Sequence, residues 1–392
     1  MKLSDHISGI KPALAALLTG CLALLTACSS GGTDKPLPEP VPSAEIGFMI
    51  EVGESFNSAE KTSRATPEGD YDRGQGYENY IDISGQDFCF YLINPADDTY
   101  ASIFDVTSII PVSSSSSSKT YQVLGRFNGS DDIQAENLKI LVLANWRGNY
   151  PDGSSLVAGV TTMNDIVSSA QAVYTFTRED MGLSASRPIP LFGVKSFPKV
   201  EYDASNFAML GRIHLLRAYA KIEVECPSDK WTMTSCLLSR YNTRGMRAPL
   251  GVSNEEDYVK GSYAGDYVSR VSVPANTPTA ENLPFIKLGR NRYLAYVPEY
   301  ANTTATGELA VDHTFISVSF QDSNFDRQFI DFKYYQNPPE GVEVGSPFDI
   351  RRNYYYKFSI DKRDESSELT VIVDVVPYGE VKLDPVFGID PK

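Results

Sequence analysis

The sequence predicts an all-β protein with a minor helix, in which antiparallel sheets pack face to face as sandwiches. Three observations predict this class. Segments with an apolar residue at every second position recur along the chain, which is typical of strands with one buried and one wet face. The 392 residues include 23 tyrosines and 19 phenylalanines, and aromatic residues favour strands. The chain also lacks the regular strand-helix alternation that builds parallel sheets.

Composition and charge narrow the function classes. A chain of 392 residues with 42% hydrophobic and 22% charged residues can bury the cores of two ordinary domains, which excludes disorder of the whole chain. The formal net charge is −15. Because nucleic-acid binding requires clustered lysine and arginine, this charge argues against a nucleic-acid partner and suits an exported protein.

The amino terminus has the features of an export signal. Two lysines precede an apolar run that is too short to span a bilayer comfortably, so residues 1–27 are expected to be a signal peptide. The small residue Ala27 before Cys28, and the serines and glycines after it, resemble a bacterial lipobox in which Cys28 is acylated. A plain secretory signal is the alternative. Residues 28–44 are rich in proline and predict a flexible tether.

The first strand signal directly follows this tether. In residues 45–52, the side chains of Ile46, Phe48, Ile50 and Val52 fall on one face at a spacing of two. Residues 53–76 are polar and glycine-rich, so they predict an exposed loop that proteases can reach.

Further elements follow in order. Strands are expected at 80–83, 87–93, 121–127 and 139–144, with a loop over the serine tract 113–118. Thr162 and Asp165 form an approximate capping box, and apolar residues then recur at helical spacing to Val173. This pattern predicts one helix packed on a sheet.

The second half of the chain contains strand after strand. Alternation of apolar and polar residues runs through 220–224, 316–320, 354–360 and 369–375. A break in the pattern between residues 196 and 212 predicts a domain boundary, which we place between 203 and 204.

Few residues are suited to catalysis or metal binding. After loss of the signal peptide, His214 and His313 are the two remaining histidines, and neither has a histidine or cysteine partner at metal-ligand spacing. Acidic pairs in turns could bind Ca²⁺, but solvated turn carboxylates are commoner. No nucleophile elbow and no zinc-protease motif occurs. The sequence therefore predicts no enzyme activity, no metal and no cofactor.

Three cysteines lie beyond the lipobox. Cys226 and Cys236 are close enough in sequence to form a disulfide, and buried thiols are the alternative. Cys89 is flanked by aromatic residues and is expected to be a small apolar strand residue.

The ordered motifs of the chain resemble a known family. Lipobox, tether, first strand and basic loop are followed by five short motifs, at 76–82, 189–193, 216–222, 350–354 and 375–378. Together they resemble the lipoprotein fimbrillin family, the donor-strand pilins of the type V pilus with their tip and anchor relatives. Members often have tryptophan near the end of the last strand, where this chain has Tyr378.

The resemblance implies a fold and a route of assembly. It implies two tandem transthyretin-like sandwich domains, here residues 45–203 and 204–392, delivered to the surface of the outer membrane on a lipid. It also implies polymerisation with other fimbrial subunits after a protease removes the first strand. A trypsin-like protease specific for arginine or lysine would cut after Arg64, with Lys61 and Arg73 as the other candidates, and displace the strand that holds Ile46, Phe48, Ile50 and Val52.

The strand that refills the groove is expected from the carboxy-terminal region, residues 369–387. Its apolar positions form two segments: Leu369, Val371, Val373 and Val375 in the first, and Val381, Leu383, Val386 and Phe387 in the second. The alternative is that both segments complete their own domain, which the alternation favours for the first segment and leaves open for the second. A second segment that folds back would make the protein a tip or accessory subunit.

A different function class remains possible. A lipid-anchored glycan-binding protein would also be acidic, all-β and rich in tyrosine, because aromatic faces stack on sugars. Its tyrosines would have to be exposed, whereas the alternation predicts that Tyr354 and Tyr356 are core residues. The adhesive ligand of a fimbrial subunit cannot be deduced from the sequence.

Overall fold

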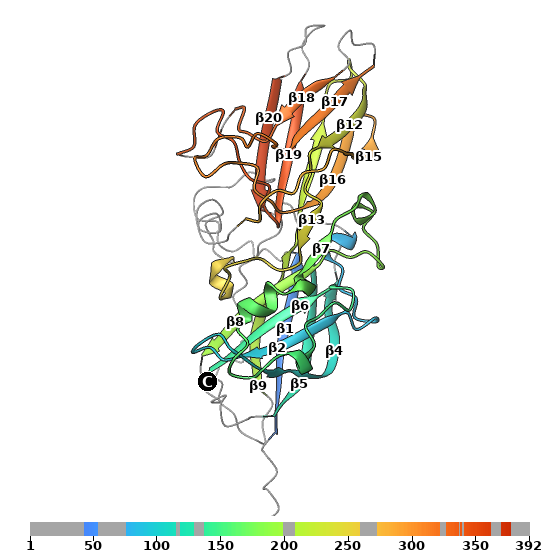
Figure 1. Cartoon of the computed structure of the whole chain (residues 1–392). Coiled ribbons are helices and arrows are strands. Elements are labelled where there is room, and N and C mark those ends of the chain that lie inside the picture. Colours follow the sequence, from blue (N-terminus) through green and yellow to red (C-terminus); the bar gives the residue numbers. More distant parts are fainter. Residues whose placement is uncertain are drawn as a thin grey trace, which may run out of the picture. The chain divides into compact units, whose positions relative to one another are not determined.

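The computed structural model describes residues 43–53, 76–114, 118–128, 137–198, 208–258, 273–321, 327–336, 338, 341–361 and 370–377. Within these ranges the chain folds into two β-sandwiches with little helix (Figure 1). The prediction of an all-β fold is confirmed.

The first sandwich consists of sheets I and II. Sheet I has the strand order β4-β5-β1-β9, and sheet II has the order β10-β8-β6-β2-β3. Their strands are β1 (Ser43–Gly53), β2 (Phe88–Ile93), β3 (Tyr100–Ile103), β4 (Asp105–Ser114), β5 (Ser118–Asn128), β6 (Asn137–Ala144), β8 (Leu191–Pro198), β9 (Ala208–His214) and β10 (Leu216–Arg217). Strands β1 to β6 and β8 to β10 therefore share one pair of sheets, and the predicted boundary between residues 203 and 204 lies upstream of the last two of these strands.

The second sandwich consists of sheets III and IV. Sheet III has the order β15-β16-β11-β19-β20, and sheet IV has the order β14-β12-β17-β18. Their strands are β11 (Tyr219–Glu225), β12 (Met233–Ser239), β14 (Asn282–Pro284), β15 (Ile286–Gly289), β16 (Arg292–Pro298), β17 (Phe315–Phe320), β18 (Gln328–Asp331), β19 (Tyr354–Asp361) and β20 (Thr370–Pro377). A small ribbon of β7 (Val173–Thr175) and β13 (Arg244–Met246) joins segments from the two halves of the chain.

The two sandwiches share one arrangement around a central strand. In sheet I, β1 pairs antiparallel with β5 and parallel with β9. In sheet III, β11 pairs antiparallel with β16 and parallel with β19. These two parallel pairs depart from the purely antiparallel sheets that the sequence predicted. A period of two shows which face of a strand is buried, but it does not show the direction of its neighbour.

Three apolar clusters hold the structure together. One lies between sheets I and II, and another fills the second sandwich. The third covers the outer face of sheet II, where the helix α2 (Met163–Val167) and residues 246–258 pack on β6 and β8. Residues 246–258 come from the second half of the chain, and we call them the crossing segment.

One local prediction is confirmed, and two differ from the structure. The capping box of Thr162 and Asp165 is present, but α2 ends at Val167 and is followed by a 3-10 turn and β7 instead of further helix. Ser168 is the C-cap of the helix and Ser169 follows it, and serine favours caps over helix interiors. Residues 80–83 are not a strand, because their backbone turns to bring the amide of Asp82 to the side chain of Asn145. The remaining 3-10 helices are Gly76–Asn79, Gly153–Ser155, Arg178–Met181 and Glu255–Asp257.

Candidate functional site

The candidate site is the groove that β1 fills in sheet I. The strand lies between β5 and β9 in the order of the sheet (Figure 1). It pairs with β5 along its whole length, from Ser43 opposite Asn128 to Gly53 opposite Ser118. Loss of β1 would therefore leave two neighbouring strands each with an unpaired backbone edge, which is an unfavourable and adhesive surface.

The inner face of β1 is completely buried. Ile46, Phe48, Ile50 and Val52 are each 0% exposed. The ring of Phe48 lies 5.5 Å from that of Phe90 and 5.6 Å from that of Phe104, measured between centroids. Burial of such side chains is worth about 1.5–3 kcal/mol each. Four of them contribute roughly as much as the whole net stability of a domain, about 5–15 kcal/mol.

The outer face of β1 contains a buried charge. The carboxylate of Glu51 is only 1% exposed and lies 2.6 Å from Nη1 of Arg212, which is on β9 and 18% exposed. A carboxylate buried to this degree requires a partner, because leaving it alone costs several kcal/mol, on the order of 3–5. The pair is thus the polar link between β1 and one wall of its groove.

A bulge in β9 places Arg212 on this face. The pairing of β1 with β9 shifts between Gly47 and Met49, where β9 contains one extra residue. Gly211 takes up the extra residue with a φ of +112°, a conformation that glycine adopts without a Cβ clash. Because a shift of one residue exchanges the two faces of a strand, the bulge is what turns Ile213 into the core and Arg212 outward.

The crossing segment bonds to both β8 and β9 and so joins sheet II to sheet I beside the groove. Glu255 accepts hydrogen bonds from the main-chain amide of His214 at 2.9 Å and forms an ion pair with Lys195 at 2.6 Å. The hydroxyl of Tyr258 accepts from the amide of Val194 on β8 and donates to the carbonyl of His214 on β9, so it bridges the two sheets. Burial alone would raise the pKa of Glu255, but the hydrogen bond from His214 and the charge of Lys195 bring it below its usual value.

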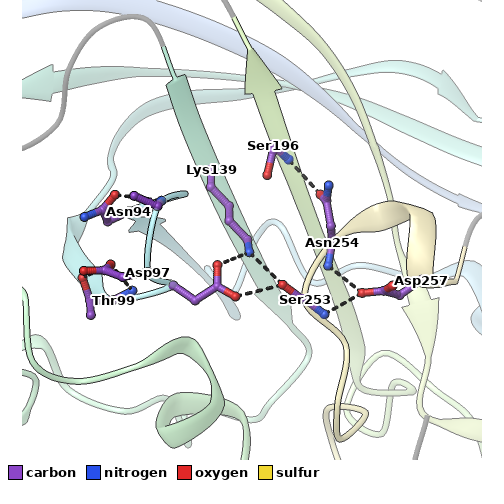
Figure 2. A network of polar contacts seen from close by, with 10 residues as sticks. Asn94, Asp97, Thr99, Lys139, Ser196, Ser253, Asn254 and Asp257 are labelled. Atoms are coloured by element: carbon purple, nitrogen blue, oxygen red, sulfur yellow. Dashed lines mark hydrogen bonds and ion pairs between the residues drawn. The ribbon is translucent and has the colours of Figure 1, made fainter. Parts of the chain in front are cut away.

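A second group of contacts fixes the crossing segment to sheet II (Figure 2). Lys139 on β6 bonds to Asp98, and the hydroxyl of Ser253 donates to the same carboxylate at 2.8 Å. The side-chain oxygen of Asn254 accepts from the amide of Ser196 at 3.0 Å. The crossing segment is therefore tied to the first sandwich at several points along its length.

Three of the sequence motifs meet in one buried polar network. The guanidinium of Arg217 is 0% exposed, and it donates to the carbonyl of Glu78 at 3.0 Å and to the side-chain oxygen of Asn353 at 3.0 Å. It also bonds to the side chain of Asn79. Lys221 lies 3.1 Å from the carboxylate of Glu78. These residues come from motifs 76–82, 216–222 and 350–354, to which sequence reasoning assigned no role.

The similarity of this chain to known proteins lies in its fold. No protein-family model matches the sequence, and no curated protein matches it. The solved structure of the tip fimbrial protein Mfa3 from Porphyromonas gingivalis, truncated at its carboxy terminus, is 12% identical with a TM-score of 0.52, and the match covers 85% of this chain and 99% of that chain. The chain is similar in fold to a fimbrial tip protein. A fimbrial assembly protein from Parabacteroides distasonis is also 12% identical, with a TM-score of 0.43, and covers 87% of this chain and 99% of that chain.

The structure describes some of the predicted site residues and not others. β1 occupies a central position in sheet I, with its four apolar residues in the core. Cys28, Lys61, Arg64 and Arg73 lie outside the described residues, and so do Leu369, Val381, Leu383, Val386 and Phe387.

The first donor segment is packed in its own sandwich. β20 is the edge strand of sheet III and pairs with β19 from Thr370 to Pro377. Val371 and Val373 are each 4% exposed and belong to the second core, and Val375 packs against it. In this structure the segment therefore completes its own sandwich.

Features typical of other function classes are scarce in the described part of the chain. It holds no group of three or more histidine, cysteine or acidic side chains suited to a metal ion. Its helices include none long and apolar enough to cross a membrane. Cys236 is a free thiol in the second core, so the structure lacks the disulfide with Cys226 that the sequence left open.

The residues that sequence reasoning missed are Glu51 and Arg212. Glu51 is the one charged residue in the stretch 46–52, and that interruption of an apolar run is a usable signal. Arg212 has no such signal, because its distance from Glu51 in sequence is 161 residues.

Proposed function

We propose that this protein is a subunit of a cell-surface fimbria that joins its neighbours by strand exchange at the groove of β1. The observation that supports it best is the position of β1. The strand fills an apolar slot in the middle of sheet I, and a segment with the candidate cut sites Lys61, Arg64 and Arg73 follows it. The fold shared with a tip fimbrial protein supports the same function.

The proposed sequence of events has four steps. The chain is exported as a lipoprotein, acylated at Cys28, and held at the outer membrane. An arginine- or lysine-specific protease cuts after Arg64, which separates β1 from the rest of the chain. β1 leaves, and the exposed slot and strand edges are unstable. A strand from another subunit then enters, with backbone hydrogen bonds providing affinity and apolar side chains filling the slot.

The polar network explains how the cut chain would keep its shape. Glu78 and Asn79, which follow the cut sites, are held by Arg217 at the end of the last strand of the first sandwich. The new amino-terminal segment would therefore stay anchored from this point onward. The cut would remove β1 and leave the rest of the contacts in place.

Amino-terminal sequencing of the fimbria-associated protein tests the proposal. We expect the assembled form to begin at Ala65, and ladders resistant to denaturing gels to appear only after protease treatment. The matched control is a variant with Lys61→Gln, Arg64→Gln and Arg73→Gln, which keeps β1 and the whole groove. An assembled form that begins at Cys28, or ladders formed by the control, would refute the mechanism.

The glycan-binding alternative gains no support from the described residues. It needs a platform of exposed tyrosines, and every described tyrosine except Tyr77 is buried or half-buried. Tyr356 is 1% exposed, as the alternation predicted for a core residue.

A further inference from the structure

We propose that Arg212 sets the register and direction of the strand that fills the groove, by pairing with a carboxylate on that strand. This inference rests on the proposed function and adds to it a selecting residue and the chemistry that it recognises. The incoming segment would need apolar residues at alternate positions and an aspartate or glutamate directly after the one that takes the place of Ile50, as β1 has at Glu51.

The apolar residues alone cannot fix the register. A shift of one residue turns every apolar side chain outward and is strongly disfavoured. A shift of two residues, however, returns apolar side chains to apolar positions, displaced by roughly 7 Å along the strand. A strand with a strict period of two therefore needs another contact to distinguish these arrangements.

The pair of Glu51 and Arg212 supplies that contact. Its charged atoms are 2.6 Å apart, and the carboxylate is 1% exposed. A shift of two residues would separate the charges by roughly 7 Å more and leave both without their partner in a half-buried site. Entry in the opposite direction would move the carboxylate to the position of Gly47, which is buried and lies opposite Met209 and Leu124.

A bulge in the wall of the groove presents Arg212 to the strand that fills it. The bulge at Gly211 is needed to place Arg212 on the outer face, as the register of β9 shows. The second sandwich has a similar pair on its own central strand, where Glu223 of β11 bonds to Arg292 at 2.5 and 2.9 Å. Arg292 lies on the antiparallel neighbour β16, whereas Arg212 lies on the parallel neighbour β9. In both central strands the glutamate directly precedes the last inward valine, Val52 or Val224.

The occupant that we assign is the tail of a second copy, which meets this requirement at Asp384 and at two of the apolar positions. With Asp384 in the place of Glu51, Val381 and Leu383 fall in the places of Phe48 and Ile50, while Gly379 and Pro385 fall in the places of Ile46 and Val52. Residues 379–385 follow β20 in the sequence, so their transfer would leave β20 in its own sheet. Residues 369–375 have the same pattern with Asp374, but they would have to abandon the second core.

Peptide capture by the nicked full-length protein tests the role of Arg212. The protein is cut in the segment 54–75 and mixed with an excess of a labelled peptide of residues 43–53 or 378–387. We expect Glu51→Lys or Asp384→Lys in the peptide to slow capture at least tenfold, and Arg212→Glu in the protein to restore capture of the lysine peptides. The control Arg292→Glu changes a similar glutamate–arginine pair in the second sandwich, outside the groove, and should restore nothing.

Crosslinking measures the register directly. Met49 lies opposite Gln122 on β5, and Gly47 lies opposite Leu124. A peptide with Met49→Cys should form a disulfide with Gln122→Cys protein and little with Leu124→Cys protein. In an Arg212→Met background, we expect the Leu124→Cys product to rise several-fold, because the shift by two residues is no longer opposed.

The outcomes separate the two proposals. If nicked wild-type protein captures no peptide, strand exchange itself is wrong and this inference falls with it. If it captures glutamate and lysine peptides equally, and Arg212→Met leaves the crosslinking pattern unchanged, strand exchange stands and Arg212 does not select the strand.

Discussion

Arg217 donates a hydrogen bond from Nε to the main-chain oxygen of Glu78 at 3.0 Å, and solvent reaches neither residue appreciably. The two are 139 residues apart in sequence. Glu78 follows the candidate cut sites, and Arg217 is the last residue of β10, two residues before β11 begins the second sandwich. This contact links the segment that maturation would expose to the junction of the two sandwiches.

Replacement of Arg217 should destabilise the protein strongly. Arg217→Met would remove a buried donor from the side-chain oxygens of Asn79 and Asn353 and from the carbonyl of Glu78. Each buried acceptor that loses its hydrogen bond costs about 1–3 kcal/mol. Urea unfolding of the uncut chain measures this cost, and Arg187→Met, at a half-exposed ion pair, is the control. A change below 1 kcal/mol would show that the network is not structural.

Gly211→Ala should weaken the wall of the groove. A φ of +112° is costly for any residue with a Cβ, about 1–3 kcal/mol. Gly289 has no atom within 4 Å of an added Cβ and no positive φ, so Gly289→Ala should be nearly neutral. Thermal unfolding compares the two, and equal effects would argue against strain at the bulge.

Truncation of the Phe48 side chain on β1 should lower the stability of the uncut chain. Phe48→Ala removes a ring with 0% exposure that packs on Phe90 and Phe104, and such changes cost about 3–5 kcal/mol. Phe329→Ala, at a ring 64% exposed, is the control. In addition, limited proteolysis of the Phe48→Ala protein should remove β1 faster than in the wild type.

Glu255 should contribute stability that depends on pH. Its pKa in the folded protein is below the ordinary value of 4.5, because the hydrogen bond from His214 and the charge of Lys195 outweigh burial. A depressed pKa means that the stabilisation is complete above the unfolded pKa and is lost as the pH falls through the folded one. Glu255→Gln should therefore be less stable than wild type at pH 7, and the difference should shrink below pH 4.5. Unfolding curves at pH 7, 5 and 3 test this, and a constant difference would contradict the assignment.

Local pattern was sufficient for much of the fold. The alternation of Ile46, Phe48, Ile50 and Val52 predicts a strand with one buried face, and the structure places all four in the core. The capping box at Thr162 is likewise a local feature. The prediction for residues 80–83 was wrong because their backbone follows a distant side chain, Asn145, and not the propensity of the segment.

The sequence by itself determined several of the strands, among them β1, β11 and β20, with their buried faces and the order of the motifs, because side-chain periodicity depends only on neighbours along the chain. The tertiary structure alone decided which strands lie beside β1, where the bulge at Gly211 turns Arg212, and which polar residues meet. The partners of Glu51, Glu78 and Glu255 are 161, 139 and 41 residues away in sequence. Contacts over such separations arise from the packing of sheets, and no local spacing encodes them.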